Sequence, residues 1–144
     1  MDPKISFESG APYIWDRIRK KAVSLTKEEW VRQHLVHLLI EHLDYPRGLI
    51  RVEAGLKYYK KAKRSDIVVY DTSGEVFLLI ECKSPETKLT SKTLHQLATY
   101  NKTLRSKHLA ISNGMKHFCW KRDEKGETYA AVSNFPRYEL SSKK

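Results

Sequence analysis

Cysteine is scarce in this sequence, and long apolar runs are missing. The chain has 2 cysteines, Cys82 and Cys119, which form no C-x-x-C pair. The sequence therefore predicts neither a disulfide framework nor a zinc ribbon, and both thiols are expected to be reduced and structural. No window approaches the roughly 18 apolar residues that a membrane span requires, and the first residues lack a charged-then-apolar signal pattern. We expect a cytoplasmic protein with no membrane segment.

Two further signatures are missing. The 6 histidines stand in no C-x-x-C or H-E-x-x-H context, so none is assigned to a metal. No G-x-x-x-x-G-K-[ST] phosphate loop occurs either. We therefore expect no ATP-driven motor in this chain.

Acidic residues are outnumbered by basic ones. The sequence has 27 Lys plus Arg against 17 Asp plus Glu, a formal charge of +10 over 144 residues. Such a field attracts polyanions, so nucleic acid is the first partner to consider, although small basic proteins also bind acidic partners or are merely soluble. The hydrophobic share of 40% is ordinary for one packed domain.

The chain divides into three parts. Residues 1–25 are expected to be an N-terminal arm or short helix packed on the domain, residues 26–138 the domain itself, and residues 139–144 a C-terminal tail. Thr26 followed three residues later by Glu29 is typical of a capping box, which predicts a helix over residues 27–43. Apolar spacing on this helix places Glu28 on its inward stripe and Glu29 to one side, but the choice between the two glutamates for a site stays open.

Strand patterns follow the first helix. We expect a strand over residues 49–53 that continues toward residue 58, a hairpin of residues 66–71 and 76–83, a helix over residues 90–104, and strands at 108–112, 115–121 and 128–134. This order predicts a mixed α/β domain.

The hairpin carries the chemistry. Side chains alternate along a strand, so Glu81 and Lys83 share one face. If Asp71 pairs with Val76, Asp66 stands opposite Glu81 with Cβ atoms roughly 5 Å apart. Two opposed carboxylates favour the binding of a divalent cation, Mg²⁺ or Mn²⁺, and a nearby ammonium can orient a water. These are the groups that metal-dependent phosphodiester hydrolysis uses. An E-x-K triplet alone is weak evidence for a catalytic site, because the triplet often occurs by chance in a lysine-rich chain.

These residues resemble a known superfamily. The stretches Arg64-Ser65-Asp66-Ile67-Val68-Val69-Tyr70 and Leu79-Ile80-Glu81-Cys82-Lys83-Ser84-Pro85 are similar to PD-(D/E)XK nucleases. More narrowly, Glu28-Glu29-Trp30-Val31-Arg32-Gln33, Gln96 with Tyr100-Asn101, and Ser112-Asn113-Gly114 resemble the N-terminal nuclease domain of type I restriction enzyme R subunits. The resemblance covers about residues 20–138. It departs from the usual pattern at Ser65, where a proline is common.

The resemblance implies a restriction-endonuclease-like core, α-β-β-β-α-β, with a central mixed sheet flanked by helices. It implies a Mg²⁺-dependent or Mn²⁺-dependent endonuclease acting on DNA, with motor, specificity or methyltransferase subunits as candidate partners. The implied roles are metal ligation by Asp66, Glu81 and the Cys82 backbone carbonyl, catalysis by Lys83, completion of the acidic cluster by Glu28, and support by Gln96 and Tyr100.

Nucleic-acid contact is also expected from Arg64, which ends a basic run, although a solvated basic loop explains that run equally well. Three alternatives to a DNA endonuclease stay open: a DNA-binding module of nuclease fold without turnover, an interaction module that is inactive without partner subunits, and a nuclease acting on RNA.

Overall fold

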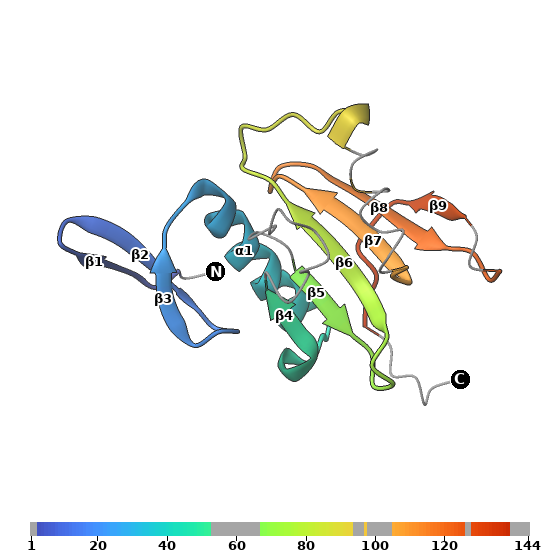
Figure 1. Ribbon diagram of the computed structural model, residues 1–144, viewed down its shortest axis with the longest axis horizontal. Helices are drawn as coiled ribbons and strands as arrows, with labels where there is room; N and C mark the ends of the chain where they lie inside the picture. Colours follow the sequence, from blue (N-terminus) through green and yellow to red (C-terminus); the bar gives the residue numbers. More distant parts are fainter. Residues whose placement is uncertain (1–2, 53–66, 94–96, 98–104, 126–127, 139–144) are drawn as a thin grey trace.

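The computed structural model describes residues 3–52, 67–93, 97, 105–125 and 128–138. This part of the chain contains one long helix and two sheets, of which the smaller is antiparallel and the larger is mixed. The helix lies between the two sheets (Figure 1). The chain is thus of mixed α and β class, as expected. None of the helices described is long and apolar enough to cross a membrane.

The N-terminal segment is a three-stranded antiparallel sheet, not the expected arm or short helix. Its strands are β1 (Ile5–Glu8), β2 (Ala11–Asp16) and β3 (Lys21–Ser24), in the order β1-β2-β3. On β2 the exposure alternates with the period of a strand: Ile14 and Asp16 are buried, whereas Trp15 between them is 44% exposed. We refer to β1 to β3 as the N-terminal sheet.

Helix α1 (Lys27–His42) begins and ends close to the expected residues. The Thr26 hydroxyl accepts a hydrogen bond from the Glu29 backbone N–H at 3.0 Å, which confirms the expected cap. The expected inward position of Glu28 is wrong, because Glu28 is exposed. It is Glu29 that is buried.

The larger sheet has six strands in the order β4-β5-β6-β7-β8-β9. Their bounds are β4 (Ile50–Val52), β5 (Ile67–Tyr70), β6 (Val76–Cys82), β7 (His108–Ser112), β8 (His117–Arg122) and β9 (Tyr129–Val132). Only the β6–β7 pair is parallel, and residues 91–93 and 97, which lie between these strands in sequence, are helical. Within the described residues the expected strands of this sheet are confirmed, with bounds that differ by at most two residues. The expected continuation of the first strand toward residue 58 lies outside the described residues. A short 3-10 helix, η1 (Arg47–Leu49), precedes β4.

The hairpin of β5 and β6 has the expected register in its inner part but not at its turn. Ile67 lies opposite Ile80, as the sequence predicts. An irregularity between Val69 and Tyr70 then shifts the pairing, so that Tyr70, not Asp71, lies opposite Val76. The bulge absorbs one residue near the turn and leaves the site end of the hairpin in the predicted register.

Each face of the larger sheet packs against a different segment. Helix α1 supplies Val31, Leu35, Val36 and Leu39 to the core on one face, which includes Ile80 and Cys82 of β6. Leu97 packs on the other face, in a smaller cluster that includes Leu79 and Ile111. From Leu78 to Cys82, side chains of β6 therefore point alternately toward α1 and toward the segment of Leu97.

Candidate functional site

Glu81 and Lys83 stand at the C-terminal end of β6. The Lys83 ammonium lies 3.0 Å from a carboxylate oxygen of Glu81, so the two side chains share a face as the strand period requires. Glu81 is only 4% exposed, whereas the Lys83 side chain is 24% exposed. The arrangement presents a buried carboxylate with a cation that solvent, or a substrate, can reach.

The parallel neighbour β7 fixes the backbone at this end of β6. Glu81 lies opposite Ile111 and Cys82 opposite Ser112, and the Lys83 backbone N–H donates to the Ser112 carbonyl at 2.8 Å. This hydrogen bond extends the pairing of β6 with β7 by one residue beyond the end of β6, and it holds the Lys83 backbone next to β7. Cys82 itself is buried in the core on the α1 face, and both cysteines are free thiols as expected.

The turn after β7 holds the segment that follows Lys83. Asn113 is 7% exposed, and its side-chain amide donates to the Thr87 carbonyl at 2.7 Å. Its side-chain oxygen accepts from the backbone N–H groups of Met115 and Lys116, each at 2.8 Å. Sequence reasoning used Asn113 only as a turn and as part of a resemblance; the Ser-Asn-Gly motif was the available signal for this positioning role.

Glycine is required in that turn for two reasons. Gly114 has a φ of +87°, and a Cβ built there would lie 3.2 Å from a methyl carbon of Val31 on α1. A side chain would therefore meet both backbone strain and the helix. This close approach brings the β7–β8 turn against the N-terminal half of α1.

The two glutamates at the start of α1 differ in burial and in contacts. Glu29 is buried in a network in which its carboxylate accepts from Gln33 at 2.8 Å and from Arg32 at 3.2 Å. Arg19, from the turn between β2 and β3, reaches the same carboxylate at 3.3 Å. Glu28 is exposed, so its expected inward position on α1 is wrong.

This network also joins the N-terminal sheet to α1. Asp16 is fully buried, and Arg19 donates to its carboxylate at 2.5 Å. Burial by itself would raise the pKa of Asp16, but hydrogen bonds from the Arg19 side chain and from the backbone of Arg19 and Ile18 hold this pKa below its usual value. Sequence reasoning missed Asp16 and Arg19, since no local pattern marks a charge that is paired across elements, and it used Arg32 and Gln33 only as part of a resemblance.

Several expected site residues lie outside the described part of the chain, namely Arg64, Asp66, Gln96 and Tyr100. Within the described part, no three His, Cys, Asp or Glu side chains gather closely enough to hold a metal ion. Glu81 is therefore the one expected acidic ligand that the structure places at the end of β6. The described residues thus include one of the carboxylates expected as metal ligands, Glu81, and the lysine beside it.

His108 is the most perturbed histidine described, but it is remote from this pair along the sheet. It lies opposite Leu78, whereas Glu81 lies opposite Ile111 three residues further along β7. Burial, followed by the nearby charges of Lys107, Lys121 and Arg122, lowers the pKa of His108 to about 4. Its neutral ring stacks near Phe77, with ring centroids 4.9 Å apart, which is a core role.

The fold and the site define a mixed α/β domain with a carboxylate–lysine pair at the end of a central strand. A search of curated proteins finds no match. The family described as type I restriction enzyme R protein N terminus matches residues 27–136. The chain belongs to this family, and the match begins at the first residue of α1, so the N-terminal sheet lies before it.

Proposed function

We propose that the chain is a metal-dependent endonuclease domain of the PD-(D/E)XK type that hydrolyses DNA phosphodiester bonds. The observation that supports this most is the Glu81–Lys83 pair, 3.0 Å apart, at the end of a buried strand in a member of a restriction-enzyme family. A carboxylate and an ammonium fixed together at a strand end are the groups that this chemistry needs.

The proposed metal ligands are Glu81, Asp66 and the Cys82 backbone carbonyl, with Mg²⁺ or Mn²⁺ as the cation. Hard divalent cations prefer such oxygen ligands. The register of Ile67 opposite Ile80 is the one from which the sequence predicts Asp66 opposite Glu81. One carboxylate alone is a poor site, so the described residues fit the metal only together with Asp66. When bound, the cation would polarise the scissile phosphate and acidify a water.

Lys83 has two roles in this proposal. Before metal binds, its ammonium neutralises Glu81, whose burial would otherwise be costly without a counter-charge. With substrate present, the partly exposed ammonium orients the attacking water or offsets negative charge that develops on the phosphate. The hydrogen bond from its backbone to Ser112 and the Asn113 turn hold it in place for this work.

We also propose a restriction-endonuclease-like core for this domain, and other subunits of a restriction enzyme as its partners. The element order α1, β4, β5, β6, the helical residues 91–93 and 97, and β7 is compatible with a restriction-endonuclease-like core. The face of β6 that carries Glu81 is the face on which Leu97 packs, and we propose that Gln96 and Tyr100 support the site from that segment. Motor, specificity or methyltransferase subunits are the proposed partners, as the family name suggests.

Cleavage of supercoiled plasmid and of single-stranded DNA with Mg²⁺ or Mn²⁺ tests the proposal. Lys83→Ala, Glu81→Gln and Asp66→Asn are compared with wild type, and Lys88→Ala is the matched control because Lys88 is an exposed lysine in the same region. We expect nicking by the wild type and by Lys88→Ala, and a loss of at least about 100-fold in the other three.

Two results would contradict the proposal. Cleavage that survives in Lys83→Ala and Asp66→Asn would place the chemistry elsewhere. No cleavage by the folded wild type, together with metal-independent and salt-sensitive DNA binding, would favour a DNA-binding module instead.

A further inference from the structure

A basic pocket lies between the N-terminal sheet and α1, apart from the Glu81–Lys83 pair. Its volume is about 600 Å³, within the usual range for small-ligand sites. β2 contributes Trp15, the turn that follows contributes Arg17 and Lys20, and Gln33 comes from α1. Because the family match begins at residue 27, most of this lining lies outside the matched region.

The lining carries an excess of positive charge. Its cations are Lys4, Arg17, Lys20 and Arg47, and no carboxylate is among the residues that line it. Arg17 is paired with Glu41 at 3.1 Å. Among the described residues, no ion pair engages Lys4, Lys20 or Arg47. Like charges gathered in a hollow repel one another, and an anionic ligand would relieve this repulsion.

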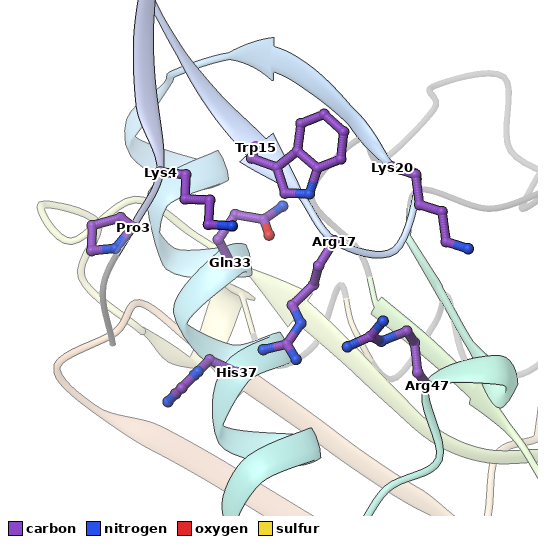
Figure 2. A pocket seen from close by; sticks show the side chains of 8 residues that line it. All are labelled: Pro3, Lys4, Trp15, Arg17, Lys20, Gln33, His37 and Arg47. Carbon is purple, nitrogen blue, oxygen red and sulfur yellow. The ribbon is translucent and has the colours of Figure 1, made fainter.

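Trp15 gives the pocket an aromatic surface. Its side chain is 44% exposed, although a tryptophan of a folded domain is usually well covered. Figure 2 shows Lys4 on one side of the indole and Lys20 on the other, with the guanidinium ends of Arg17 and Arg47 below it. An exposed indole flanked by cations is the combination that binds unpaired nucleotides, through base stacking and phosphate contacts.

The wall on the α1 side is held rigidly. Gln33 is 2% exposed and donates to the Glu29 carboxylate at 2.8 Å, within the network that also includes Arg32 and Arg19. Asp16, the residue between Trp15 and Arg17, is fully buried and paired with Arg19. These contacts fix the end of β2, which presents Trp15, and the turn that begins at Arg17, so little ordering is needed when a ligand binds.

We propose that this pocket binds a nucleic-acid strand through an unpaired nucleotide, with a base stacked on Trp15 and phosphates held by Lys4, Lys20 and Arg47. A strand fits better than a free nucleotide because cations lie on both sides of the indole, as successive phosphates lie on both sides of a base. The pocket binds without metal and serves as a docking site separate from the Glu81–Lys83 pair.

The test measures fluorescence anisotropy of a labelled oligothymidylate of about 12 nucleotides, with EDTA present and NaCl varied from about 50 to 200 mM. Lys4→Gln/Lys20→Gln is compared with Lys121→Gln/Lys125→Gln, which removes the same charge from two exposed lysines of the β8–β9 region. Trp15→Leu tests stacking alone. Thymidine monophosphate and triphosphate compete as free nucleotides.

We expect the pocket pair to weaken binding about tenfold and to lower the slope of log K against log salt by about 1.4, since each single-strand phosphate contact contributes about 0.7. The control pair should change affinity less than about twofold, and Trp15→Leu should weaken binding at least about fivefold without changing the slope. Equal losses in the two lysine pairs, or an unchanged slope in the pocket pair, would overturn the proposal. Free nucleotides that compete as well as the oligonucleotide would overturn the assignment to a strand.

Discussion

Among the described residues, Glu29 is the one carboxylate paired with Arg32, the most deeply buried arginine of that part of the chain, and replacing Glu29 by Gln removes this charge. Arg32 is 1% exposed, and its side chain lies 3.0 Å from a Glu29 oxygen. Its Nε already has no hydrogen-bond partner among the described residues. Breaking a buried pair from one side typically costs 3 to 5 kcal/mol, roughly, because the remaining charge is left uncompensated.

The matched control is the neighbouring residue. Glu28→Gln makes the same chemical change in the same helical turn, but Glu28 is exposed. Both substitutions lose the favourable interaction of a first-turn carboxylate with the helix dipole, about 0.5 kcal/mol. Because Gln can still hydrogen-bond in place of Glu29, we expect the lower end of the range, so Glu29→Gln should reduce the free energy of unfolding by about 3 kcal/mol.

Urea unfolding followed by circular dichroism at neutral pH gives both values. For a chain of this length, the expected losses in the free energy of unfolding correspond to a fall in Tm of about 9 °C for Glu29→Gln and of about 1 to 2 °C for Glu28→Gln. Equal effects of the two substitutions would refute the assignment of Glu29 as the buried member of the pair. So would a Glu29→Gln protein that is as stable as wild type.

Two further predictions concern the fold. The pKa of His108 lies near 4, below its ordinary 6.5, so the unfolded chain binds the proton first and stability falls as pH drops between these values; from pH 7 to 5 the loss should be about 2 kcal/mol. Urea unfolding at both pH values should show that the free energy of unfolding of His108→Gln changes between them by about 2 kcal/mol less than that of wild type. The same change in both proteins would contradict the role of His108. Gly114→Ala should destabilise by about 2 kcal/mol, because it combines positive-φ strain with contact against Val31. Gly74→Ala, with a φ of +88° but nothing within 4 Å, should lose only about 1 kcal/mol, and equal losses would show that the contact has no effect.

The central strands could be predicted because their signals are local. β6 and β7 are apolar runs bounded by turn residues, and β7 spans His108–Ser112, as the sequence predicts. A strand buried on both faces needs such a run whatever packs against it. The Glu81–Lys83 pair follows from the same local rule, since the two residues are separated by one position on a strand.

The choice between Glu28 and Glu29 could not be made from periodicity. A single apolar stripe assumes that one layer covers the helix, but α1 packs against the larger sheet and also meets the N-terminal sheet through the Arg19–Glu29 pair. The second layer buries polar residues such as Arg32 and Gln33, which hydropathy assigns to the surface. The N-terminal sheet was missed for a related reason: its strands are short, and buried Asp16 is stable only with Arg19 from a turn.

The pairing register of the β5–β6 hairpin could be predicted from the local sequence only in part. Counting from the turn gave the correct partner for Ile67 but the wrong partner for Val76, because a bulge lies between Val69 and Tyr70. Bulges depend on twist and on contacts with neighbouring strands, which a sequence pattern does not show.

Binding of Mn²⁺, followed by electron paramagnetic resonance, tests the proposed site most directly, because it requires neither partner subunits nor the correct DNA. We predict that wild type binds Mn²⁺, that Glu81→Gln and Asp66→Asn lose this binding, and that Lys83→Gln binds at least as tightly as wild type because a competing cation is removed. Wild type that binds no Mn²⁺, or Glu81→Gln that binds it unchanged, would contradict the account.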